Sequence, residues 1–131
     1  MLRSINPYTN ALIEEHTEDA ESVIQTKLLQ SDTAFSYWKN ISIEARAYIL
    51  KDIAKRLLEE KHTFANMITE EMGKPISESI LEIEKSAWVC TYYAENAAQT
   101  LSPTYPKTES YKNIVRYEPM GVLLAIMPWN F

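Results

Sequence analysis

The chain has 131 residues, enough for one domain, and its 46% hydrophobic content is ordinary for a globular protein. Its net charge of −5, without a basic cluster, argues against binding nucleic acid, and its single cysteine excludes an internal disulfide. The longest apolar run, residues 122–127, is far shorter than the roughly 20 residues of a membrane-spanning helix. The first seven residues lack the apolar core of a signal peptide, so we expect a cytoplasmic protein without a nucleic-acid or membrane partner.

The N-terminal part predicts a β-hairpin followed by a helix. Residues 5–16 combine turn residues at positions 6–10 with a short apolar strand at Leu12 and Ile13. Thr17 is the expected N-cap, with Glu18 and Asp19 in the first turn, where the helix dipole favours acids. Apolar and small residues then recur at spacings of three and four up to about Lys39, and they define one helix face: Ala20, Ile24, Leu28, Ser31, Phe35 and Trp38.

Three further helices are predicted. Ser42 is the expected cap of the second, whose buried stripe is Ile43, Ala47, Leu50, Ala54 and Leu57. A shorter helix starts near His62 and ends at Gly73, where a left-handed residue closes a helix. The longest starts near Ser77, ends before Pro103, and carries the stripe Ile80, Ile83, Ala87, Cys90, Ala94 and Ala97. Lys74 is expected to be structural, and the charged patch of Glu82, Glu84 and Lys85 is expected on a solvated face.

The last part of the sequence predicts strands. From residue 111 to 118 the pattern has a period of two, which indicates a strand with at least one wet face. Residues 122–127 are apolar without a break, as in a strand buried on both sides, and such strands belong mostly to parallel sheets whose ligands bind beyond the strands' carboxyl ends. Asn130 follows at that end, and its neutral amide is suited to donating to an oxyanion. By residue type alone, an asparagine that caps a turn is the more common case. Because a buried strand needs partners, we expect the chain to be the front part of a larger protein.

Three motifs carry a resemblance to the NAD(P)-dependent aldehyde dehydrogenases. P-M-G-V at residues 119–122 with I-M-P-W-N-F at residues 126–131 resembles that family's P-x-G-V…I-x-P-W-N-F stretch. E-M-G-K-P-I at residues 71–76 resembles its E-x-G-K-P segment, and N-P-Y-T-N at residues 6–10 resembles its N-P-x-T-G turn, with Asn10 where Gly is usual. The motifs keep the family's order over nearly the whole chain, which would correspond to about the first quarter or third of a member. The details look most like bacterial succinate-semialdehyde dehydrogenases.

The resemblance implies an α/β fold, of which this chain would form the N-terminal part. That part would be a mainly helical block of about four helices, with an N-terminal β-hairpin and C-terminal strands. Residues 1–131 would be an incomplete cofactor-binding domain, and residues 107–118 would belong to an oligomerisation arm. The implied cofactor is NAD or NADP, the substrate is a small aldehyde such as succinate semialdehyde, and the full-length protein would be a homo-oligomer, either a dimer or a tetramer.

The resemblance also implies roles for individual residues. Asn130 would be catalytic, donating its amide to the aldehyde oxygen during attack by a cysteine, while Ile126, Met127, Pro128 and Trp129 would line the nicotinamide-ribose side of the cofactor cleft. Cys90 lies on an apolar stripe and is rejected as the nucleophile. The family's nucleophilic cysteine and general-base glutamate lie beyond this stretch, so the 131-residue chain alone is expected to be inactive. No residue spacing suggests a metal site. The alternative is a stand-alone helical protein-interaction module without catalysis.

Overall fold

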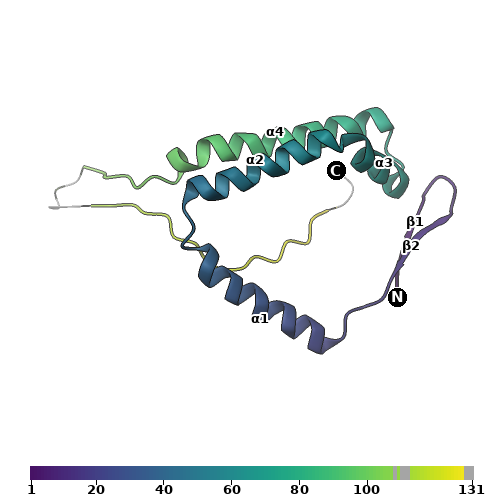
Figure 1. Cartoon of the computed structure of the whole chain (residues 1–131), viewed down its shortest axis with the longest axis horizontal. Coiled ribbons are helices and arrows are strands. Elements are labelled where there is room, and N and C mark those ends of the chain that lie inside the picture. Colours follow the sequence, from purple (N-terminus) through teal and green to yellow (C-terminus); the bar gives the residue numbers. More distant parts are fainter. Residues whose placement is uncertain (108, 110–112, 129–131) are drawn as a thin grey trace.

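The structure is a computed structural model that describes residues 1–107, 109 and 113–128. Two strands, β1 (Leu2–Ile5) and β2 (Leu12–His16), precede four helices, which are α1 (Glu21–Trp38), α2 (Ile43–Glu59), α3 (Lys61–Met72) and α4 (Ile76–Thr100). Figure 1 shows the mainly helical block with its N-terminal hairpin, as the sequence predicts. None of the helices in this described part is long and apolar enough to cross a membrane.

The hairpin is organised by its turn. The Asn6 Oδ1 atom accepts hydrogen bonds from the backbone N–H groups of Tyr8, at 2.9 Å, and Thr9, at 3.0 Å. Asn10 takes a positive φ of 59°, which asparagine tolerates better than most residues, so it substitutes for the glycine usual in the resembling motif. The strands pair antiparallel from Leu2 opposite His16 to Ile5 opposite Leu12. The predicted hairpin is therefore confirmed, with a first strand that begins at Leu2.

Helix α1 differs from its prediction at its start and in its burial. It begins at Glu21 after Ala20, without a side-chain cap, so the prediction of Thr17 as N-cap is wrong. None of its residues is buried, and Leu28, in the middle of the expected core face, is 56% exposed. Figure 1 shows α1 standing apart from α2 and α4, which explains this exposure.

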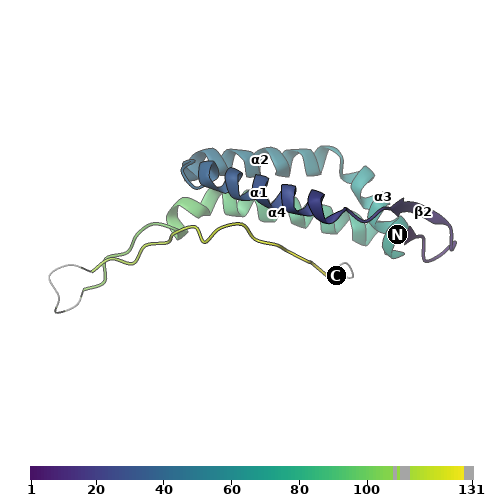
Figure 2. The same cartoon turned by 90° about the horizontal axis from the view of Figure 1, so that it is seen from below.

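Helices α2, α3 and α4 form the packed part of the molecule. Ser42 caps α2 as predicted, because its Oγ accepts a hydrogen bond from the Ala45 N–H at 3.1 Å. Helices α2 and α4 run side by side, and α3 packs against α4 (Figures 1 and 2). The buried apolar side chains are mostly small, which lets the helix backbones approach closely: Ala54, Ala65, Ile83 and Ala87.

The strands predicted after α4 are not formed in the described part of the chain. Thr104 and Val115 make one isolated antiparallel bridge, with N–H···O distances of 3.0 and 2.9 Å. Residues 113–128 are otherwise without regular secondary structure, so the predictions of a strand up to residue 118 and of a buried strand at 122–127 are wrong for this structure. Leu123 is 84% exposed and Leu124 89% exposed. The physical reason is that a strand requires a neighbouring backbone, and in the described ranges only Thr104 lies in bridging position.

Candidate functional site

The predicted site residues lie at the C-terminal end of the exposed segment. Ile126 is 87% exposed and Met127 is 73% exposed, and Pro128 is exposed as well. Trp129 and Asn130 lie outside the described residues. Residues 126–128 thus form an exposed apolar surface. The roles assigned to residues 126–130 remain predictions.

The beginning of this segment lies against α1. Gly121 and Val122 share a groove of about 370 Å³ with residues of the C-terminal half of that helix, including Phe35 and Trp38. The segment then continues along the helical block, as the yellow trace in Figure 1 shows. Helix α1 therefore contacts the stretch that leads to the predicted site at the start of that stretch, at Gly121 and Val122.

The E-M-G-K-P motif forms the corner between α3 and α4. Gly73 ends α3 in the left-handed region with φ of 69°, which confirms its predicted role. Glu71 accepts a hydrogen bond from the Ser4 Oγ at 3.3 Å, and a Cβ at Gly73 would lie 3.1 Å from the Pro7 Cγ. The motif therefore joins the hairpin to the helical block.

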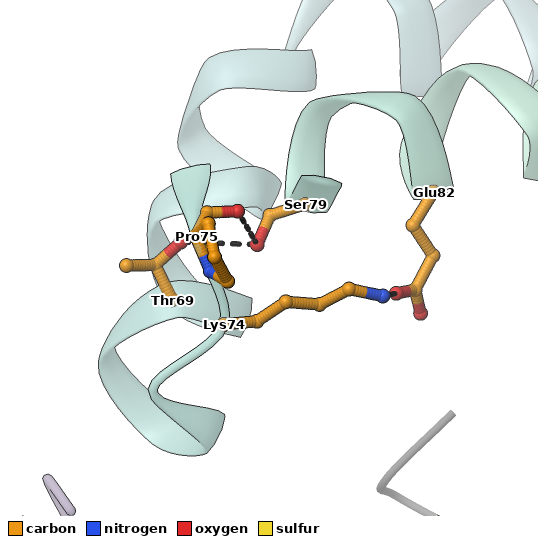
Figure 3. A network of polar contacts seen from close by, with 5 residues as sticks. All are labelled: Thr69, Lys74, Pro75, Ser79 and Glu82. Carbon is orange, nitrogen blue, oxygen red and sulfur yellow. Dashed lines mark hydrogen bonds and ion pairs between the residues drawn. The ribbon is translucent and has the colours of Figure 1, made fainter. Parts of the chain in front are cut away.

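Polar contacts fix the other side of the same corner (Figure 3). Lys74 forms an ion pair with Glu82, and the Ser79 hydroxyl, which is fully buried, lies 3.0 Å from the Thr69 Oγ and donates to the Pro75 carbonyl at 3.3 Å. Burying the Ser79 hydroxyl is tolerable because it has these partners. The corner is thus held by charge on its surface and by hydroxyl contacts inside.

Glu82 and Glu84 differ from the solvated face expected for them. Each is only partly exposed, and each pairs with a lysine from outside α4: Glu82 with Lys74, and Glu84 with Lys61, whose Nζ lies 2.7 Å from the Glu84 Oε1. The sequence spacing did not predict these pairs because their members are 8 and 23 positions apart. The two ion pairs connect α4 to α3 and to the connection between these helices.

Residues with other reactive chemistry are dispersed. Cys90 is half-buried on α4, in keeping with its interpretation as a small apolar residue. His16 is exposed on β2, 3.9 Å from Glu14. Within residues 1–107, 109 and 113–128, no group of three or more His, Cys, Asp or Glu residues is arranged to hold a metal ion.

The fold places this chain in a class of dehydrogenases. It superposes on succinic semialdehyde dehydrogenase from Streptococcus pyogenes, solved with NADP+, with a TM-score of 0.81 and 25% identity, over 86% of this chain and 25% of that chain. The match to indole-3-acetaldehyde dehydrogenase in its apo form has a TM-score of 0.86 and 26% identity, over 99% of this chain and 30% of that chain. The architecture is thus that of an aldehyde dehydrogenase.

The sequence agrees with the fold. Residues 1–131 match the aldehyde dehydrogenase family, and the chain belongs to this family. It is 38% identical over 128 residues to the NAD(P)+ succinate semialdehyde dehydrogenase Sad of Escherichia coli (strain K12). That alignment covers 98% of this chain and 28% of the relative, so the chain spans less than a third of the relative's length.

Proposed function

We propose that this chain is part of an NAD(P)-dependent dehydrogenase that oxidises a small aldehyde, succinate semialdehyde in particular, to its carboxylate. The observation that carries the proposal is the family match along all 131 residues, which includes the motif ending in P-W-N-F. The 38% identity to an enzyme named for succinate semialdehyde supports the substrate. We propose a cytoplasmic location for the enzyme.

Asn130 is the residue through which the chain would take part in catalysis. In the proposed reaction, a cysteine thiolate outside residues 1–131 adds to the aldehyde carbon, and negative charge develops on the carbonyl oxygen. The Asn130 amide donates a hydrogen bond to that oxygen without introducing a competing acid. A glutamate, also outside these residues, activates the water that releases the carboxylic acid.

Residues 126–129 would form one wall of the cofactor site. The exposed apolar side chains of Ile126 and Met127 suit contact with the face of a nicotinamide ring, and Pro128 and Trp129, the next residues in the sequence before Asn130, would contribute to the same wall. Bound NAD or NADP supplies the acceptor for the hydride. The chain's own contribution is therefore to place an apolar surface beside the oxyanion donor.

Assembly into a homo-oligomer, a dimer or a tetramer, belongs to the same proposal. Residues 107–118 would form part of the oligomerisation arm. The bridge between Thr104 and Val115 supports this assignment because it joins the stretch before the arm to a residue near the arm's C-terminal end. An arm fixed at its base can present its edge to a second subunit.

A chimeric enzyme tests the proposal. Residues 1–131 replace the matching stretch of the Escherichia coli relative, and NAD(P)H formation from succinate semialdehyde is followed by absorbance. The chimera is expected to be active, and Asn130→Ala is expected to lower kcat on the order of 10²-fold, as removal of an oxyanion donor does. The matched control is Asn66→Ala, because Asn66 is exposed on α3. A folded but inactive chimera would contradict the proposal, and unchanged turnover in Asn130→Ala would remove Asn130 from the site.

The isolated chain separates the proposal from the interaction-module alternative. The pure 131-residue protein should produce no NAD(P)H, and its formation would contradict our placing of the nucleophile outside these residues. A module without catalysis would be a clean monomer with cooperative melting in size-exclusion and calorimetric experiments. A dehydrogenase part with an uncovered apolar segment should instead self-associate.

A further inference from the structure

An apolar groove of about 420 Å³ lies where the end of α1 meets α2 and the end of α4. Its main lining side chains are Trp38, Ile43, Leu50, Ile53 and Leu101. Trp38 is 41% exposed and Ile53 is 42% exposed, so large side chains of the lining are left to water. Apolar surface of this kind is typical of a surface that another polypeptide covers.

Arg46 places a buried polar atom in this groove that needs a hydrogen-bond acceptor. It lines the groove from α2, and its Nε is buried without a hydrogen-bond partner among the described residues. Buried polar groups are nearly always paired, because one that loses water and gains no acceptor is costly. A guanidinium in an apolar surrounding is best satisfied by a carboxylate, which combines charge with a hydrogen bond. The groove therefore suits an apolar segment that carries one acidic side chain.

We infer that this groove receives a segment from the rest of the dehydrogenase polypeptide, with a carboxylate of that segment on the Arg46 Nε. The inference rests on the proposed function, under which the relatives' length leaves ample chain to supply the segment, since this chain spans 28% of the Escherichia coli relative. Arg46 is a positioning residue in this arrangement, holding the helical block against the remainder of the enzyme.

The first experiment compares Arg46→Met in two settings, namely the chimera described above and the isolated chain. In the chimera, the substitution should leave the partner carboxylate buried without a hydrogen-bond donor and should therefore lower Tm by several degrees. In the isolated chain it removes a polar atom that has no partner among the described residues, and the helical circular-dichroism signal should stay the same or rise. The matched control is Arg56→Met, since Arg56 lies on α2 and pairs with Asp52 on the surface, and it should have the same small effect in both settings. Equal effects of the two substitutions in the chimera would overturn the inference.

The second experiment measures whether the groove is covered. Acrylamide quenching of Trp38, taken as the difference between each protein and its Trp38→Phe variant, should be several-fold weaker in the chimera than in the isolated chain. Equal quenching would overturn the inference, as would an Arg46-dependent dimer of the isolated chain in analytical ultracentrifugation. The two proposals fail in different ways. Loss of the proposed function shows as a folded chimera without activity, whereas loss of this inference shows as an active chimera whose groove stays open.

Discussion

Replacing Gly73 by alanine tests the idea that the corner between α3 and α4 is also the attachment point of the hairpin. Gly73 has a φ of 69°, and an L-residue in that region costs about 1–2 kcal/mol relative to glycine. The new Cβ would also lie 3.1 Å from the Pro7 Cγ, closer than the roughly 3.5–4.0 Å of a favourable carbon contact. Because Pro7 lies in a turn that can shift, we assign this contact up to about 1 kcal/mol. The expected loss in the free energy of unfolding is thus about 2 kcal/mol, a large part of the roughly 5–15 kcal/mol available to a domain.

The assay is urea unfolding of the chimera described above, followed by circular dichroism at the helical band. With an unchanged slope, the shift of the midpoint gives the loss of stability. In a Pro7→Ala background the same substitution should cost less, because the Cγ atom is absent, and the difference isolates the contact. Gly121→Ala is the matched control, since Gly121 also has a positive φ but lies outside the helical block and a Cβ there would meet nothing within 4 Å. If both alanine variants unfold at the same midpoint, the reasoning is refuted.

Two further predictions use the same assay. Ser79→Ala should cost about 1–3 kcal/mol, because it removes a fully buried hydroxyl that contacts the Thr69 Oγ, whereas Ser86→Ala on the exposed side of α4 should be nearly neutral. Equal effects would show that the buried contact is not stabilising. Ser42→Ala should cost about 1 kcal/mol through loss of the α2 cap, and Thr17→Ala should cost less, because Thr17 caps no helix. A larger loss of stability for Thr17→Ala than for Ser42→Ala would show that Thr17 does cap the helix.

The features predictable from the sequence are those that local chemistry decides. Ser42 is followed directly by an amphipathic stretch, and Gly73 is the single residue near the end of α3 that takes a left-handed conformation without strain, so both ends could be placed in advance. The prediction of Thr17 as the cap depended on its residue type and on the two acids that follow it, and that pattern does not report which other contacts those acids make. In the structure Asp19 forms an ion pair with Lys27, and the helix starts later, after Ala20.

Features that depend on distant parts of the chain could not be predicted in this way. The pairing of Lys61 with Glu84 spans 23 positions. The Arg46 Nε, which has no partner among the described residues, is recognised only once the helices are packed. Periodicity reports which face of a helix is apolar, but it does not report what covers that face. Helix α1 is an example, because its predicted stripe is present but none of its residues is buried.

The segment at residues 122–127 shows why a strand is not a local property. Its composition is that of a buried strand, yet β-propensity measures how well side chains fit a covered, pleated surface, and within the described residues no such surface adjoins it. The likeness to indole-3-acetaldehyde dehydrogenase nevertheless extends over 99% of the chain with a TM-score of 0.86, so the segment lies within the part that superposes. Within the described residues, the segment lacks the hydrogen-bonding neighbours that a strand requires. Under the proposed function, the same neighbours that turn this segment into a strand would cover Leu123 and Leu124 and hold Asn130 in position, so that formation of the sheet and assembly of the oxyanion site would be one event.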